Sequence, residues 1–115
     1  MATSRRPAEP ARPLPLSPRE ELQRQRVAIV TFLADRGAHS PRLFGSVARG
    51  DDDDDSDVDL LIEFADSRTR GEELLAVLGL SEELSEILAL RVHVASPATL
   101  RPEVGKQASA EAVPL

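Results

Sequence analysis

The segment from residue 44 to residue 60 constrains the fold of this chain more than any other. It reads FGSVARG, then five consecutive aspartates, then SDVDL. Gly45 and Ser46 favour a turn, because glycine accepts the backbone conformations that tight turns need. Residues 58–64, VDLLIEF, place acids at alternating positions among apolar residues and predict a β-strand. The order expected here is an extended segment, a Gly-Ser turn, a short helical turn over 46–50, an acidic loop and a strand.

The other segments complete a small α+β pattern. Ser17, Pro18 and Glu20 form a helix-start signal, and apolar residues at helical spacing follow it as far as Leu33, with a stop at Gly37. Further elements are predicted at 39–44 (extended), 71–90 (helix, interrupted at Gly79), 90–95 (strand) and 102–112 (helix). The buried face of the long helix is expected to consist of Leu74, Leu75, Leu78, Leu84, Ile87 and Leu88. These elements predict an α+β domain, a small mixed sheet with helices packed on one face.

The ends and the composition set the class of protein. Residues 1–16 contain four prolines and predict a flexible arm, and residues 17–115 suffice for one domain. The chain has no cysteine, which excludes a disulfide framework and a cysteine-ligated zinc site and fits the reducing cytoplasm. No apolar run approaches the roughly 20 residues of a membrane span, and no apolar segment follows Arg5 and Arg6, so neither a membrane anchor nor a signal peptide is expected.

The acidity of the chain is a local feature. The net charge is −6, and the aspartates between residues 51 and 59 supply seven of the twenty acidic residues. We expect Asp51 to Asp55 to form a solvated loop of like charges with no ligand role. The chain has no basic stripe interleaved with aromatic rings, since it contains three Phe and no Trp or Tyr. Long nucleic acids are bound through such features, so a mononucleotide is the better-fitting ligand.

Asp57 and Asp59 are the candidate metal ligands. Residues two apart on a strand project from the same face, so the two carboxylates are expected side by side. Such a pair repels itself unless a cation lies between its members, and hard oxygen ligands suit Mg²⁺ or Mn²⁺. These metals neutralise the charge that develops during phosphoryl transfer. The pair therefore predicts a site for a metal-bound nucleoside triphosphate.

The Gly-Ser turn is the candidate phosphate site. Gly45 lets the backbone approach a phosphate closely, and Ser46 opens a helical turn whose amides add positive partial charge. Arg49 lies one turn further on, where it can reach a phosphate or pair with the aspartates.

This set of motifs resembles the minimal nucleotidyltransferase family, small relatives of the DNA polymerase beta palm within the same superfamily. The family pattern is Gly-Ser, then Ala-Arg-Gly, then Ser-Asp-x-Asp-Leu, and it is matched here by Gly45-Ser46, Ala48-Arg49-Gly50 and Ser56-Asp57-Val58-Asp59-Leu60. The likeness extends from about Glu20 to the C-terminus, because a strand at 90–95 and the following Ser-Pro-x-x-Leu-x-Pro also fall where the family has them.

The resemblance implies a palm-like sheet and Mg²⁺-dependent transfer of AMP from ATP. It implies nucleotide contacts for Gly45, Ser46, Arg49 and Ser56. Small members of the family are often antitoxins that bind and modify a HEPN-type RNase toxin on a tyrosine. This chain contains no tyrosine, so it cannot be its own tyrosine acceptor.

His93 departs from the family pattern. The pattern has a third carboxylate at this place on the last strand, and here the strand reads RVHV. Three readings follow: His93 ligates metal or acts as the catalytic base, it shifts the metal preference away from Mg²⁺, or the site binds without turnover. We take His93 as a catalytic residue together with Asp57 and Asp59.

Two other functions compete with AMP transfer to a partner protein. The first is a degenerate nucleotidyltransferase that neutralises its partner by binding alone. The second is transfer to a small molecule, against which the short chain argues, because little of it is left to build an acceptor pocket. A palm-like domain without further lobes is expected to borrow surface from a partner or from a second copy.

Overall fold

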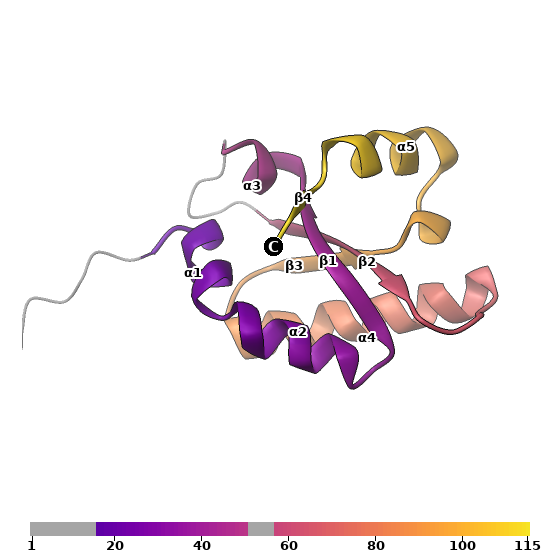
Figure 1. Ribbon diagram of the computed structural model, residues 1–115, viewed down its shortest axis with the longest axis horizontal. Helices are drawn as coiled ribbons and strands as arrows, with labels where there is room; N and C mark the ends of the chain where they lie inside the picture. The colour runs from indigo at the N-terminus through magenta and orange to yellow at the C-terminus, as the bar shows by residue number, and fades with distance from the viewer. Residues whose placement is uncertain (1–15, 51–56) are drawn as a thin grey trace, which may run out of the picture.

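A four-stranded mixed sheet organises the computed structural model, which describes residues 16–50 and 57–115 (Figure 1). The strand order is β3-β2-β1-β4, where the strands span Val92–Ala95, Val58–Phe64, Ala38–Phe44 and Val113–Pro114. β1 pairs antiparallel with β2 and with β4, and β2 pairs parallel with β3. The predicted strands are thus confirmed, and β4 is an addition. Residues 1–15 of the predicted N-terminal arm, the Asp51–Asp55 run and Ser56 lie outside the described residues.

The first helical segment is two helices, where one was predicted. α1 spans Pro18–Arg24 and begins with the expected capping box, in which the side chains of Ser17 and Glu20 each bond the other's backbone N–H. Gln25 then leaves the helical conformation, with φ −101° and ψ 15°, and α2 spans Arg26–Ala34. Leu22 and Leu33 are fully buried on either side of the bend. Apolar spacing therefore located the core residues correctly but could not reveal the bend.

The long helix α4, Arg70–Leu88, contradicts two predictions. It runs through Gly79 without interruption. Its buried residues are Val77, Leu80, Leu84 and Leu88. The predicted buried face is therefore confirmed at Leu84 and Leu88 but wrong at the other four positions, Leu74, Leu75, Leu78 and Ile87, which are exposed. Apolar residues surround this helix on more than one side, and two stripes compete for the core. The stripe that packs against the sheet is Val77, Leu80, Leu84 and Leu88, which follows the i, i+3, i+7, i+11 positions of one face.

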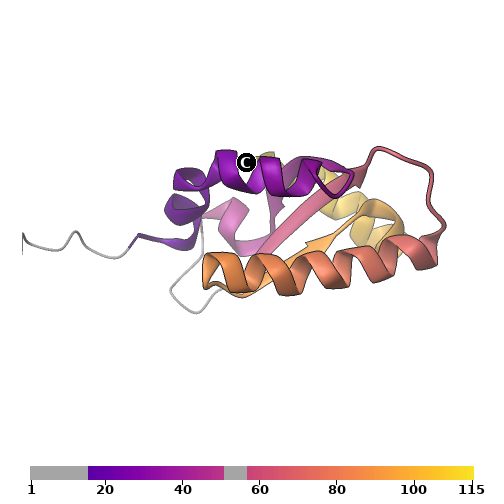
Figure 2. The same ribbon diagram turned by 90° about the horizontal axis from the view of Figure 1, so that it is seen from below.

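The core lies between the sheet and the pair α2 and α4. Figure 2 shows these two helices together on one side of the sheet, as expected, whereas Figure 1 shows α5, Pro102–Glu111, on the other side. Val58, Leu60 and Ile62 of β2 belong to the core cluster of α2 and α4. Because side chains alternate along a strand, Asp57 and Asp59 face the opposite side, where α3, Gly45–Arg49, also lies. The alternation of β2 thus separates the core from the candidate site.

The free edge of the sheet at β3 is closed by two serines of α4. The Val94 N–H donates to Ser81 Oγ at 2.8 Å, and the Val92 N–H donates to Ser85 Oγ at 3.0 Å. These amides point away from β2, so without the serines they would present unpaired donors to a neighbouring chain. No helix in the described part of the chain is long and apolar enough to cross a membrane.

Candidate functional site

The candidate site lies where the end of β1 meets the first residues of β2 and the middle of β3. In the sheet register, Asp59 is opposite Phe44 of β1 and opposite His93 of β3. Gly45 and α3 follow directly after Phe44. The register therefore brings the Gly-Ser turn, the aspartate pair and His93 together, although they come from three separate segments of the chain.

Gly45 is packed directly against the carboxylate of Asp59. Its φ is +76°, a conformation that residues with side chains rarely adopt. A Cβ atom added to Gly45 would lie 2.6 Å from Asp59 Oδ2. Glycine is thus required here for two reasons, the backbone conformation and the space that the carboxylate occupies.

Asp57 is approached by two nitrogen atoms from β3 and the residue before it. Arg91 Nε lies 2.9 Å from Asp57 Oδ1, and His93 Nε2 lies 3.5 Å from Asp57 Oδ2. Asp57 Oδ1 is itself shielded from solvent and makes no hydrogen bond within the described residues, because Arg91 meets it as an ion pair without hydrogen-bond geometry. A shielded carboxylate oxygen with an unmet hydrogen-bonding capacity is suited to ligation by a cation.

The environment of Asp59 opposes its ionisation. Burial is the largest cause and raises the pKa of the Asp59 carboxyl, and the neighbouring charge of Asp57 raises it further. His93 and Arg49 act in the opposite direction and lower this pKa. The net effect is a raised pKa, which means that the folded protein carries Asp59 as an anion at the expense of stability. A bound cation would relieve this cost.

Asp59→Asn is therefore expected to stabilise the metal-free fold at neutral pH. Because the pKa of Asp59 is raised in the folded state, the protonated carboxyl favours folding at a pH below the ordinary aspartate pKa. This contribution to the free energy of unfolding is lost as the pH rises through the raised pKa. The wild-type Tm, measured by circular dichroism with a chelator present, should lie below that of Asp59→Asn at pH 7. The two Tm values should converge in acid. A variant that is less stable than wild type at pH 7 would contradict the raised pKa.

Asp57 and Asp59 fit a metal ion that is bound partly by these two carboxylates and partly by a nucleotide. No cluster of three or more His, Asp or Glu side chains that could hold a metal ion occurs among the residues that the structure describes. The pair Asp57 and Asp59 remains, with the unmet Oδ1 atom of Asp57 and the raised pKa of Asp59. Mg²⁺ is commonly bound by one or two carboxylates, with phosphate oxygens and water completing its shell. The pair thus suits a metal–nucleotide complex better than a free ion.

The remaining predicted site residues lie around the turn. Ser46 is partly buried in α3, and the exposed Arg49 at the end of α3 lies 3.9 Å from Glu111 of α5. A small groove of about 170 Å³ beside Gly45 and Arg49 is lined on its other side by α5. Ser56 lies outside the described residues. Arg49 is therefore close enough to the turn to contact a phosphate, but its side chain would have to move away from Glu111 to do so.

Arg91 is the residue that sequence reasoning missed. It lies two positions before His93, so the alternation that places His93 beside Asp57 also places Arg91 on that side. The two-residue spacing of Arg91 and His93 would have identified Arg91 as a neighbour of Asp57 if the parallel pairing of β3 with β2 had been known.

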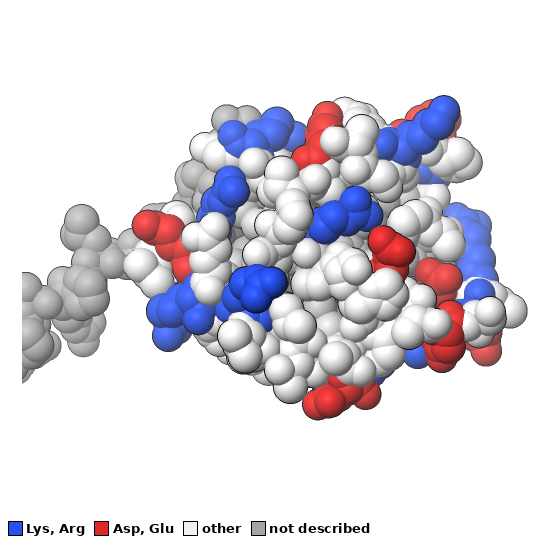
Figure 3. Space-filling model, in the orientation of Figure 1, with Lys and Arg blue, Asp and Glu red and all other residues white. Residues whose placement is uncertain are grey.

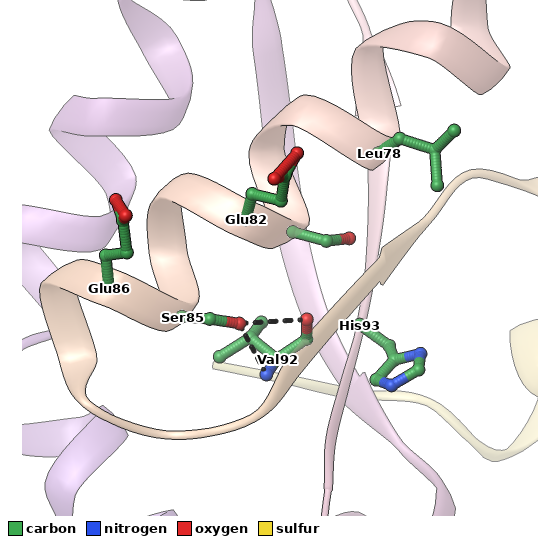
Figure 4. Close-up of a pocket in the computed structure, with 7 residues that line it drawn as sticks. Leu78, Glu82, Ser85, Glu86, Val92 and His93 are labelled. Atoms are coloured by element: carbon green, nitrogen blue, oxygen red, sulfur yellow. Dashed lines mark hydrogen bonds between the residues drawn. The ribbon is translucent and has the colours of Figure 1, made fainter.

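A larger groove, of about 560 Å³, opens beside His93 (Figure 4). It lies between α4 and β3 and is lined by Leu78, Ser81, Glu82, Ser85, Glu86, Val92 and His93. The face of the molecule drawn in Figure 3 carries basic and acidic side chains in scattered positions, with no continuous basic stripe.

Comparisons with known proteins agree with the geometry. The profile of the nucleotidyltransferase domain family matches residues 28–114. A protein assigned as a protein adenylyltransferase in Methanocaldococcus jannaschii is 33% identical over 85 residues, 74% of this chain and 87% of that protein. The protein adenylyltransferase MntA of Thermococcus cleftensis is 34% identical over 77 residues, 67% of this chain and 74% of that protein.

Two solved structures share the fold. One is described as a minimal nucleotidyltransferase and superposes with a TM-score of 0.69 at 40% identity, covering 84% of this chain and 95% of the other. The second is a crystal structure of a toxin–antitoxin with AMP-PNP, with a TM-score of 0.63, covering 80% of this chain and 70% of the other. At 17% identity the second likeness concerns the fold alone.

Proposed function

Since this chain belongs to the nucleotidyltransferase domain family, we propose that it transfers AMP from ATP to a hydroxyl group of a partner protein. The observation that carries the proposal is the contact between Gly45 and the Asp59 carboxylate, beside Asp57. This contact supports the proposal because it places the Gly45-Ser46 turn and the aspartate pair close enough for one nucleotide to reach both.

The proposed reaction is an in-line displacement at the α-phosphorus. The acceptor oxygen forms a bond to that phosphorus, the bond to the bridging oxygen of the β-phosphate breaks, and pyrophosphate leaves. Asp57 and Asp59 would hold Mg²⁺ or Mn²⁺, which supplies neutralisation of the triphosphate charge when it is bound. Gly45, Ser46 and Arg49 would position the triphosphate, with Ser56 beside them. His93 would accept the proton of the acceptor hydroxyl, a role that imidazole side chains commonly take in general base catalysis.

The proposed partner is a toxin protein of the HEPN RNase type, neutralised in the cytoplasm by modification. Two findings support a protein acceptor: the relatives named protein adenylyltransferase, and the toxin–antitoxin with the same fold. The lack of tyrosine in this chain agrees with an acceptor tyrosine on another protein.

Intact mass spectrometry of the co-purified partner tests this function. Incubation with ATP and Mg²⁺ should add one or more AMP units to the partner, and a chelator should prevent the addition. The Asp57→Asn variant, purified in the same complex, is the control and should leave the mass unchanged. A partner that binds stably, starts unmodified and gains no mass with the wild-type protein would contradict AMP transfer and support neutralisation by binding alone. Turnover with small hydroxyl compounds and no protein acceptor would support the small-molecule alternative.

Two substitutions of His93 test its proposed role. His93→Ala should lower the rate of transfer by about 10²- to 10⁴-fold, the usual contribution of a general base. His93→Asp should retain transfer, because a carboxylate there can also accept a proton and would add a third oxygen ligand beside Asp57 and Asp59. Rates measured over a range of Mg²⁺ concentrations should show a lower Mg²⁺ requirement for His93→Asp than for wild type. Equal rates for His93→Ala and wild type would remove His93 from the mechanism.

A further inference from the structure

We propose that the groove between α4 and β3 is the docking surface for an amphipathic helix of the partner protein, with lysine or arginine residues flanking its apolar face. The proposal rests on the proposed function, because it names the kind of acceptor that this site would receive. His93 is one of the residues that line the groove, and its Nε2 atom lies 3.5 Å from Asp57. A segment bound in the groove would therefore lie beside the reacting atoms.

The apolar side of this surface consists of leucines that the core does not use. Leu74 and Leu78 project from α4 with 47% and 56% of their surface exposed. Leu78 also lines the groove, so the exposed leucines continue from it along the helix. Neighbouring exposed apolar side chains of this size are characteristic of protein interaction sites.

The charged side of the surface consists of two glutamates. Residues 71–90 contain five glutamates and no lysine or arginine. Three of the five have local partners: Glu72 caps α4, Glu73 accepts a hydrogen bond from Ser96, and Glu83 pairs with Arg36. Glu82 and Glu86 line the groove, and neither has an ion-pair partner in the described part of the chain. Figure 4 shows them projecting from successive turns of α4. This arrangement is complementary to a cationic partner.

The backbone of β3 excludes the other common mode of peptide binding. An extended peptide could add to an edge strand only by bonding its free amides, and those of Val92 and Val94 are already bonded to Ser85 and Ser81. A partner segment must therefore bind through side chains, as a helix does when it lays an apolar face in a groove.

Peptide binding, measured by fluorescence anisotropy without ATP, tests the docking surface. The probes are two labelled amphipathic peptides with leucines at helical spacing, one with lysines and one with glutamates beside the leucines. The lysine peptide should bind the wild-type protein, and its affinity should fall as salt is raised. The double variant Glu82→Lys/Glu86→Lys should bind it at least about tenfold more weakly, since two attractions become repulsions.

A matched control distinguishes the effect of charge at this surface from the effect of the net charge of the protein. Asp35→Lys/Glu103→Lys changes the charge by the same amount at two exposed positions on α2's end and α5, and it should bind the lysine peptide like wild type. Equal binding of both peptides, or undiminished binding by Glu82→Lys/Glu86→Lys with an unchanged Tm, would overturn the proposal. Because these measurements need no turnover, failure of AMP transfer would leave the docking result standing, and the reverse also holds.

Discussion

Asp57→Asn is expected to lower AMP transfer by about three orders of magnitude while leaving the fold intact. The amide keeps the size of the side chain but removes the charge that would hold a cation against the triphosphate. Loss of one group that stabilises transition-state charge costs about 10²- to 10³-fold in rate, and the loss of a metal ligand belongs at the upper end. The same substitution removes the negative charge that lies 2.9 Å from Arg91 Nε.

The measurement is the initial rate of AMP incorporation at saturating ATP and Mg²⁺. Glu63→Gln is a matched control, because it also removes the charge of a single acid, and Glu63, on β2, is exposed and lies near Arg42, away from the site. Glu63→Gln should change the rate by no more than about twofold, since an exposed ion pair contributes little. A rate for Asp57→Asn close to wild type would show that this carboxylate takes no part in transfer.

The alternation of β2 made most of the site predictable. Alternation along residues 57–64 assigns Val58, Leu60 and Ile62 to one face and leaves Asp57 and Asp59 on the other, and the structure confirms that Val58, Leu60 and Ile62 belong to the core. The positions of the glycine turn and of α3 also follow from local sequence. In these segments, the residues that decide the structure are neighbours along the chain.

The predictions failed where contacts between residues far apart in the sequence determine the structure. On α4, Leu84 and Leu88 were predicted to be buried and are. The leucines at 74, 75 and 78 have the same hydrophobicity as Leu80, however, and only contact with the sheet buries Leu80 and leaves the other three exposed. Arg91 meets Asp57 because β3 pairs in parallel with β2, a contact between residues far apart in sequence. The approach of Glu111 to Arg49 depends in the same way on where α5 docks.

Gly45→Ala is expected to disable the site and weaken the fold together. Alanine at φ +76° costs about 1–3 kcal/mol in backbone strain. In addition, the new Cβ atom would lie 2.6 Å from Asp59 Oδ2, so the carboxylate must move away from the turn. A displacement of about 1 Å at a catalytic group commonly lowers the rate by about 10²-fold. Transfer rate and Tm, measured on the same preparation, should therefore both fall.

Gly50→Ala separates these two causes. Gly50 has almost the same φ, +79°, but an added Cβ atom would meet nothing within 4 Å. This variant should lose stability through strain alone and keep most of its transfer activity. Asp59→Ala provides the second separation, because without that carboxylate the stability lost on Gly45→Ala should fall to the value for Gly50→Ala. Equal losses of activity in Gly45→Ala and Gly50→Ala would show that backbone strain, and not the position of Asp59, limits the reaction.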